Sequence, residues 1–569
     1  MLSVLLNWIY IFLMSFIFGE AVIRLFFRKG GYEKEGSLTT CLVCGLSVLT
    51  IYAEYYSLIS GVGLACNIVM VLAAIVLAAV RRKEYLKAVR RILKETACWK
   101  LAIYVLLILI CAFYSANGAI TYDSGLYHAQ SIRWIEEYGT VKGLGNLHMR
   151  FGYNSAYFSL AALFSMKFLL GQSMHAVSGF IVAVMSVYAV NGILNVKNGV
   201  LKGVKICHCG ILLYTLFILT ECISPSTDYI SIYFFLWLIT TWVELIENKQ
   251  KELLPYCMLS LFAAFLVTVK LSVGFLVLLV IWPACILIKK KRWKEIGIFL
   301  GLGVAAVLPY LLRNMIVSGW FIYPSLKLFQ FDWSVPYEIG RGDSIDITTY
   351  ARGTIERDTI NWSPVRWIPV WWERMDYITQ KLLKWMIFAI VAEILEFVIC
   401  FFKKWKQKDE VWFAFAYLEA ILLINCFVWL CSAPIVRYGF AIVIAIPVVF
   451  IAGHFGRGFR GAHLAMNLVI ILISGYMLLR PLALKSIEVV STTRDWANEQ
   501  LYFGMQKDYP HPVMHSCNNH GITIYYPEDD GGQSWYDAFP ATNFESTAQN
   551  VQLRGTTIRD GFKGASDGK

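Results

Sequence analysis

Residues 122–157 read YDSGLYHAQSIRWIEEYGTVKGLGNLHMRFGYNSAY and form the longest polar interval in the first half of the chain. Strongly apolar segments flank this interval on both sides. From Ser124 to Tyr138, apolar and polar residues alternate at roughly helical spacing, which is typical of a helix that lies along a membrane surface. We therefore expect a short interfacial helix with Asp123 at its N-terminal end, capped by Asp123 or Ser124. Its solvated face would carry Glu136 and Glu137.

The composition places the whole chain in the membrane class. Of 569 residues, 58% are hydrophobic and only 16% are charged, and the mean hydropathy is +0.57. Such a chain is a polytopic membrane protein. The formal charge of +12 comes from Lys and Arg clustered in short loops at helix ends, so we expect lipid head groups and no nucleic acid as partners. Most of the 14 cysteines lie in apolar runs, where they act as small hydrophobic residues.

The apolar segments predict about 13–14 transmembrane helices, because each is near the roughly 20 residues that cross the hydrocarbon layer. They are residues 4–27, 37–57, 61–80, 99–118, 153–193, 206–222, 229–246, 253–269, 271–288, 295–312, 377–402, 410–430, 438–454 and 463–481. We expect 153–193 to contain a short helix that does not fully cross, followed by one that does. The chain is thus predicted to be an all-α integral membrane protein.

Basic loops predict the orientation, since such loops stay in the cytoplasm. The loops expected inside are 28–36, 81–100, 194–205, 289–294, 403–408 and 457–460. On the extracytoplasmic side we then expect the loops 119–152, 223–228, 313–376 and 431–437 and the tail after 482. We predict a membrane domain over 1–482 and a small extracytoplasmic α+β or β-rich domain over 483–569, because GITIYY (521–526) is a β-like run between turn residues.

A second long outer loop spans 313–376 and is rich in Trp and Tyr, which suits the membrane interface. It could fold as a lid over a site. Its Arg-Gly-Asp tripeptide, Arg341–Asp343, is given no function.

Ionisable residues beside membrane spans are the candidate functional residues, because charge near the bilayer is costly. Four places qualify on the outer side, and they contain Asp123 with His128, Asp228, Arg313 with Asn314, and Arg437 with Lys270. Asp123 and His128 are five residues apart and would not share a face of a regular α-helix. Carboxylates and cations gathered on one face suit a reaction between a lipid-phosphate donor and a hydroxyl acceptor. A cation stabilises the leaving phosphate, and a carboxylate takes the acceptor proton or holds a divalent metal.

Each candidate also has a structural interpretation. Arg313 and Arg437 could extend to lipid head groups, and Asp228 could be a helix N-cap. His128 could be a packed interfacial residue. For Asp123 the functional interpretation is stronger, because there is a specific precedent for a carboxylate that follows a span and begins an amphipathic helix.

That precedent is the GT-C superfamily of integral membrane glycosyltransferases, which this arrangement resembles. Those enzymes use polyprenyl-phosphate sugars and carry an essential Asp or Glu in the first large outer loop, and Asp123 is at the matching position. The stretches TYDSGLYHAQSIRWIEEYGTVKGLGNLHMRFGYNSAYF, SPSTDY, RNMIVSGWFIYPS and APIVRYGF also resemble a family of uncharacterised bacterial polytopic membrane proteins. The tail of that family often has two cysteines where this chain has Ser534 and Ala541. The resemblance therefore implies no disulfide here and leaves Cys517 unpaired.

The resemblance implies an inverting glycosyltransferase at the outer face of a bacterial cytoplasmic membrane. It would take a lipid-linked sugar donor and a glycan, lipid or protein acceptor. The expected roles are general base or Mg²⁺/Mn²⁺ ligand for Asp123, orientation for His128, and substrate binding for Asp228, Lys270, Arg313, Asn314 and Arg437.

Two alternatives remain open. A polysaccharide polymerase or ligase that uses a lipid-diphosphate-linked glycan would depend on arginines of the second outer loop, which are Arg341, Arg352, Arg357, Arg366 and Arg374. A transporter or flippase would depend on charges within spans, and the candidates are Glu20, Arg24, Glu393 and Glu396.

Overall fold

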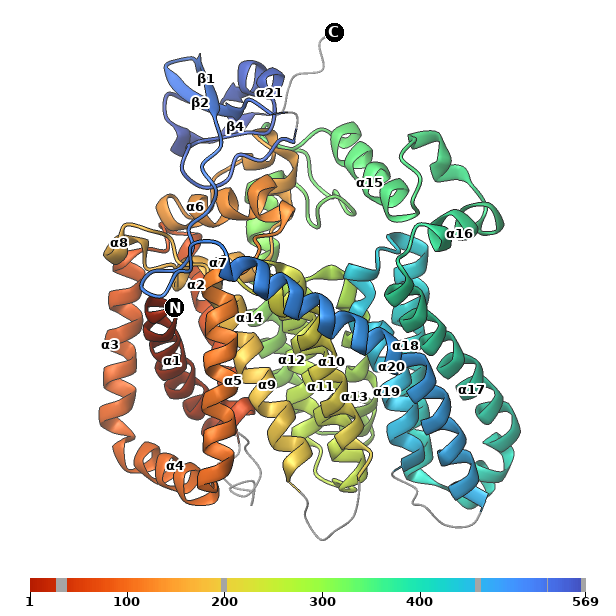
Figure 1. Ribbon diagram of the computed structural model, residues 1–569. Coiled ribbons are helices and arrows are strands. Elements are labelled where there is room, and N and C mark those ends of the chain that lie inside the picture. The colour runs from red at the N-terminus through yellow and green to blue at the C-terminus, as the bar shows by residue number, and fades with distance from the viewer. Residues whose placement is uncertain (27–37, 196–201, 456–461, 530, 564–569) are drawn as a thin grey trace.

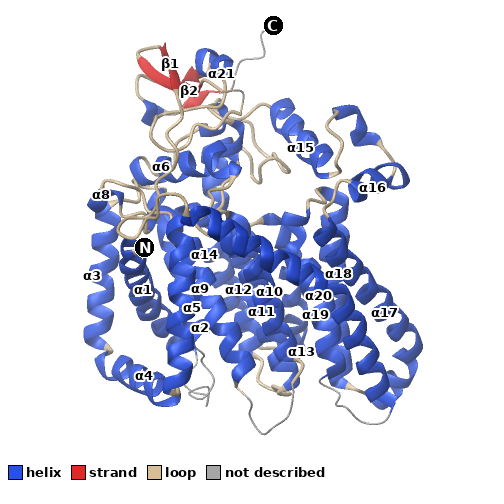
Figure 2. Cartoon of the chain, viewed as in Figure 1, coloured by secondary structure: helices blue, strands red, loops and turns tan. Residues whose placement is uncertain are grey.

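A computed structural model describes residues 1–26, 38–195, 202–455, 462–529 and 531–563 and shows a helical bundle with a small strand-containing cap (Figures 1 and 2). The predicted loops 28–36 and 457–460 lie outside the described residues, as do residues 196–201 of the predicted loop 194–205. The helices up to the centre of the chain are α1 (Leu2–Phe26), α2 (Leu38–Ser57), α3 (Leu64–Val80), α4 (Arg82–Glu95), α5 (Cys98–Asn117), α6 (Ala129–Glu137), α7 (Ala156–Leu163), α8 (Lys167–Leu170), α9 (Val177–Leu194), α10 (Val204–Ile218), α11 (Thr227–Glu247) and α12 (Leu254–Val269). They are followed by α13 (Ile281–Lys289), α14 (Trp293–Ser318), α15 (Tyr337–Ala351), α16 (Pro364–Glu373), α17 (Tyr377–Gln407), α18 (Glu410–Ser432), α19 (Val436–Phe455), α20 (Ala462–Ala497) and α21 (Glu545–Asn550).

The bundle confirms a multi-pass membrane protein. Among the described residues, 12 helices are long and apolar enough to cross a membrane. Helices α11 and α19 form its centre, because 89% and 78% of their most apolar windows are buried inside the protein. A helix that is apolar all round needs such surroundings.

The two ends of the bundle differ in chemistry. At the lower end in Figure 1, the chain bends by 84° between α3 and α4, and α4 is an amphipathic helix with several Lys and Arg. We call this the basic end. The opposite end, which we call the cap end, carries α6, α15, α16 and the C-terminal strands.

Several helix boundaries match the segments predicted from the sequence, and others differ from them. The segment 153–193 has the short helices α7 and α8 followed by the spanning α9, as predicted. The segment 253–269 forms α12, whose 16 residues are fewer than a full crossing needs. The segment 271–288 begins as a 3₁₀ helix, η6 (Leu271–Val280), before it becomes α13. Helix α20 continues through Pro481 to Ala497, so the domain boundary predicted at residue 482 lies inside a helix. Transmembrane helices tolerate such an internal proline.

The C-terminal segment contains two small antiparallel sheets. Strands β1 (Met514–Asn519) and β2 (Ile522–Pro527) pair with each other, and β3 (Gln552–Leu553) pairs with β4 (Phe562–Lys563). The predicted strand in GITIYY is therefore present as β2. All 14 cysteines are free in the described chain, Cys517 included.

Candidate functional site

A π-helical turn determines how the first polar loop presents its side chains. Ser124–His128 form this turn (η2), in which the Ala129 N–H donates to the Ser124 carbonyl five residues earlier. Residues five apart therefore come onto one face, and Asp123 interacts electrostatically with His128. The expectation from a regular α-helix was wrong here, and π-turns are frequent at functional sites. Within the described chain, the Asp123 side chain makes no capping hydrogen bond.

Asp123 lies in a cluster of four charged residues that come from four separate parts of the sequence. Arg437 Nη2 lies 2.7 Å from Asp123 Oδ2, and Arg437 Nε lies 3.4 Å from Asp228 Oδ2. Lys270 forms an ion pair with the other oxygen of Asp228. We call Asp123, Asp228, Lys270 and Arg437 the four-charge cluster. The structure thus brings together residues from three of the four predicted places.

Helix ends at the cap end of the bundle position this cluster. Asp228 is in the first turn of α11, and Arg437 is in the first turn of α19. Lys270 follows the last residue of α12. The N-cap of α11 is Ser226, whose hydroxyl accepts from the Asp228 N–H, so the interpretation of Asp228 as an N-cap was wrong.

Exposure differs strongly within the four-charge cluster. The Asp228 side chain is 5% exposed, whereas 44% of the Arg437 side chain is accessible. Arg437 contacts the carboxylates of Asp123 and Asp228 through its Nη2 and Nε atoms. An arginine has five N–H donors in a planar fork, so Arg437 keeps donors on Nη1 for a further ligand. Paired with two carboxylates, Arg437 is held in place and does not simply extend to head groups.

The ionisation states of Asp123 and His128 follow from their surroundings. Burial acts to raise the pKa of Asp123, but the positive charges of Arg437 and Lys270 outweigh it and lower the pKa below the usual value. Burial lowers the pKa of His128 to about 3. Near neutral pH, Asp123 is therefore a carboxylate and His128 is an uncharged imidazole. The ring of His128 packs at a centroid distance of 5.3 Å from Phe158, so it is both packed and close to the cluster.

The structure adds residues that the sequence analysis did not select. The Tyr438 ring lies beneath Lys270, whose Nζ is 4.3 Å from the ring centroid. Arg150 Nη2 pairs with Asp343 Oδ1 at 3.0 Å, and the Tyr153 hydroxyl donates to Asp343 Oδ2 at 2.5 Å. Arg150 also interacts electrostatically with Tyr438, which links this pair to the four-charge cluster. Asp343 belongs to the Arg-Gly-Asp tripeptide and is buried, so it is a structural partner of Arg150.

Arg313 and Asn314 do not join the four-charge cluster. Arg313 Nε donates to Asn154 at 2.9 Å, Nη1 donates to Ser57, and the guanidinium interacts electrostatically with Glu54 of α2. Arg313 is 3% exposed and Asn314 is 1% exposed. Arg313 therefore belongs to a buried network that reaches α2, and Asn314 is buried beside it in the sequence. Neither residue contacts the four-charge cluster in the described part of the chain, so their predicted role in substrate binding stays a prediction.

Helix α6 is only partly solvated. Glu137 is exposed, as expected, and pairs with Arg133 at 2.7 Å, whereas the side of Glu136 is covered, contrary to the expectation. Glu136 is buried and accepts hydrogen bonds from the Tyr536 hydroxyl and, at 2.8 Å, from Ser173. Gln130 donates to the main-chain carbonyls of Trp535 and Ala538. The C-terminal segment therefore packs on the helix that begins next to Asp123.

The part of the chain that the structure describes contains no preformed metal site. Within the described ranges, no group of three His, Cys, Asp or Glu side chains is close enough to hold a metal ion. The two carboxylates of the four-charge cluster, Asp123 and Asp228, are both paired with Arg437.

Comparison with protein families identifies the family of this chain. Residues 1–444, more than three quarters of the chain, match the family described as a domain of unknown function, DUF8201. The chain belongs to this family. The match contains Asp123, Asp228, Lys270 and Arg437, so the whole four-charge cluster lies inside the region that defines DUF8201. No curated protein and no solved structure matches the chain.

Proposed function

We propose that this DUF8201 protein is a GT-C-like glycosyltransferase that moves a sugar from a polyprenyl-phosphate donor to a cell-envelope glycan, lipid or protein. The observation that carries the proposal is the four-charge cluster at one end of a membrane bundle. It combines an ionised carboxylate, Asp123, with an accessible guanidinium, Arg437. A phosphate-linked sugar that arrives from the membrane needs both groups.

In the proposed reaction, Asp123 accepts the proton of the acceptor hydroxyl. The acceptor oxygen forms a bond to the anomeric carbon of the sugar while the bond from that carbon to the phosphate oxygen breaks. The polyprenyl phosphate leaves with the electron pair, and Arg437 and Lys270 stabilise its negative charge. Attack from the face opposite to the leaving group inverts the anomeric configuration.

Arg437 couples donor binding to the basicity of Asp123 in this proposal. In the free protein, Arg437 helps to lower the pKa of Asp123. A donor phosphate that draws Arg437 away from Asp123 raises that pKa and makes the carboxylate a better base. Asp123 thus becomes a stronger base only when the donor is bound.

Asp123 and Asp228 are the residues that would hold a Mg²⁺ or Mn²⁺ ion once Arg437 binds the donor. Such an ion would add positive charge at the leaving phosphate. The basic end would face the cytoplasm by the positive-inside rule. The cluster and the C-terminal segment, proposed as a small α+β domain, would then lie on the outer side of a bacterial cytoplasmic membrane.

The contacts of the second long loop favour this donor over a diphosphate-linked one. Arg357 forms a bidentate pair with Asp346, and Arg352 and Arg366 lie over the rings of Trp367 and Trp362. These arginines stabilise the loop itself. The transporter alternative is supported by the buried Glu393 in the interior of α17, a residue that is not part of the four-charge cluster.

A donor panel tests the proposal. Purified protein in proteoliposomes is given radiolabelled polyprenyl-monophosphate sugars, a polyprenyl-diphosphate oligosaccharide and a crude envelope-lipid acceptor fraction. We expect transfer from at least one monophosphate donor and none from the diphosphate donor. Transfer only from the diphosphate donor would establish the polymerase or ligase instead, and labelled donor that crosses the bilayer without transfer would establish transport.

A further inference from the structure

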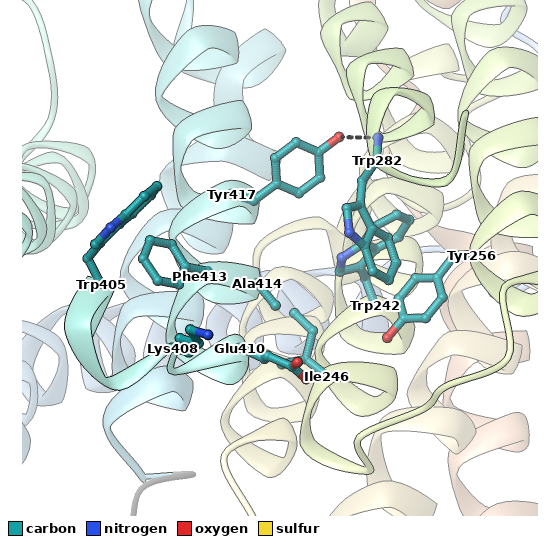
Figure 3. Close-up of a pocket in the computed structure, with 10 residues that line it drawn as sticks. All are labelled: Trp242, Ile246, Tyr256, Trp282, Trp405, Lys408, Glu410, Phe413, Ala414 and Tyr417. Atoms are coloured by element: carbon teal, nitrogen blue, oxygen red, sulfur yellow. Dashed lines mark hydrogen bonds between the residues drawn. The ribbon is translucent and has the colours of Figure 1, made fainter. Parts of the chain in front are cut away.

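A cavity lined by helices of the bundle lies far from the four-charge cluster, near the basic end. Its volume is about 700 Å³, within the range of about 300–1,000 Å³ typical of ligand sites. Helices α11, α12 and α13 form one wall, and α17 and α18 form the other (Figure 3). All of these helices belong to the membrane bundle, so the cavity opens between apolar helices of that bundle.

Aromatic rings face one another across this cavity. One wall carries Trp242, Tyr256 and Trp282, and the other carries Trp405, Phe413 and Tyr417 (Figure 3). The wall on α11–α13 is held together by edge-to-face contacts, with ring centroids 5.0 Å apart for Trp242–Tyr256 and 4.5 Å apart for Tyr256–Trp282.

The inner end of the cavity is buried, whereas its mouth is exposed to the surroundings. Trp242 and Tyr256 are buried at its inner side, whereas Trp405 is 64% exposed. The Tyr417 hydroxyl is engaged, because it donates to the Leu278 carbonyl at 2.7 Å. The cavity therefore offers mainly apolar surface, with exposed indole at its mouth.

The basic end supplies charge at one side of the cavity. Lys408 and Glu410 line it directly. The preceding residues of α17 add three more lysines, of which Lys404 is paired with Asp409 at 2.7 Å. Lysines thus outnumber acidic residues over 403–410. Tryptophan at head-group depth next to Lys is the usual arrangement at a membrane interface.

We propose that this cavity binds one anionic phospholipid, with an acyl chain between the aromatic walls and the phosphate at Lys408. Lipid is the solvent around these helices, and an apolar opening between them is filled by lipid tails. Lys408 at the cavity selects a negatively charged head group over a zwitterionic one. The exposed Lys403 and Lys406 of the last turns of α17 add to this preference, because they give residues 403–410 a net positive charge despite Asp409 and Glu410. The site is independent of the four-charge cluster and of the proposed glycosyl transfer.

Native mass spectrometry of the full-length protein in detergent tests this site, with phosphatidylglycerol and phosphatidylcholine of matched chains as probes. We expect one tightly bound phosphatidylglycerol and weaker binding of phosphatidylcholine. Ala414→Trp, which fills the cavity, should abolish the tight site. Lys408→Gln should reduce the preference for phosphatidylglycerol about fivefold. Lys83→Gln, a change of an exposed lysine on α4 at the same end, should leave binding unchanged.

Three outcomes would overturn the proposal. The first is equal binding of the two phospholipids, and the second is unchanged phosphatidylglycerol binding by both Ala414→Trp and Lys408→Gln. The third is displacement of the bound phospholipid by polyprenyl phosphate at equal concentration, which would assign the cavity to the donor lipid. If Ala414→Trp fails to fold, Lys408→Gln and its Lys83→Gln control decide the question alone.

Discussion

The guanidinium of Arg437 lies 2.7 Å from the Asp123 carboxylate and 3.4 Å from that of Asp228. This one side chain connects the first polar loop to the N-terminal ends of α11 and α19. It also lowers the pKa of Asp123 and keeps this residue ionised. Asp123 cannot be understood as an isolated loop residue, because its charge state depends on Arg437 of α19, a central helix of the bundle that lies more than 300 residues later in the sequence.

Arg437→Gln should reduce sugar transfer about 100-fold or more, because it removes the cation that meets the leaving phosphate. Arg366→Gln is the matched control in the second long loop, where Arg366 lies over Trp362. The rates of both variants are measured in proteoliposomes at saturating donor. A larger loss for Arg366→Gln than for Arg437→Gln would favour the polymerase or ligase.

Gly125→Ala should loosen the C-terminal segment. A Cβ at this position would lie 2.5 Å from Trp535 Cε2, so the ring and the π-turn must separate. Overpacking of this kind costs about 1–3 kcal/mol. Faster cleavage of the C-terminal segment by a protease reports the change. Gly504→Ala, where a Cβ meets no atom within 4 Å, should be cleaved like the wild type, and equal cleavage of both variants would refute the packing argument.

Tyr536→Phe should destabilise the protein by about 1–3 kcal/mol, because it removes a hydrogen bond to a buried carboxylate. Burial raises the pKa of Glu136, and the Tyr536 hydroxyl is one of the groups that stabilise its charged form. Thermal unfolding in detergent measures the loss. The control is Tyr350→Phe, since Tyr350 is 71% exposed, and a similar melting temperature for both variants would contradict the prediction.

His128→Gln should make the protein less sensitive to acid. Burial lowers the pKa of His128 to about 3, against 6.5 for an exposed histidine. Between these two pH values the unfolded state binds a proton that the folded state does not, so stability falls as the pH is lowered through this range. The drop in melting temperature from pH 7.5 to pH 5 should therefore be smaller in His128→Gln. The control is His515→Gln, a change of an exposed histidine, whose melting temperature should drop as much as that of the wild type. If the drop in His128→Gln is as large as in the wild type, His128 does not cause the acid sensitivity.

The sequence predicts the membrane class well. It also predicts that charged residues at the ends of spans gather at one end of the bundle. Long apolar runs define spans directly, and Asp123, Asp228, Lys270 and Arg437 each lie where a span begins or ends. Because consecutive spans alternate in direction, charges at alternate helix ends come to one side of the membrane. That reasoning predicted the residues of the four-charge cluster without showing which of them touch.

The remaining features depend on contacts that no local pattern encodes. Residue spacing gives an α-helical period, so the π-turn after Asp123 and its alignment with His128 were not visible. Arg313 lies at a helix end like Arg437, but its neighbour Glu54 on α2 draws it into a buried network. Glu136 has the spacing of a solvated face and is covered only because a distant segment packs on it. Arg150 and Tyr438 gain meaning only next to the assembled cluster.

Sugar transfer by Asp123→Asn is the most direct test of the central claim. The variant is compared with wild type and with Asp346→Asn, which makes the same chemical change at an exposed ion pair with Arg357. All three proteins are reconstituted at equal density, with matched melting profiles and the active polyprenyl-monophosphate sugar. We predict that transfer is lost in Asp123→Asn and retained in Asp346→Asn. Full transfer by a correctly inserted Asp123→Asn would contradict the assignment of this carboxylate as the base.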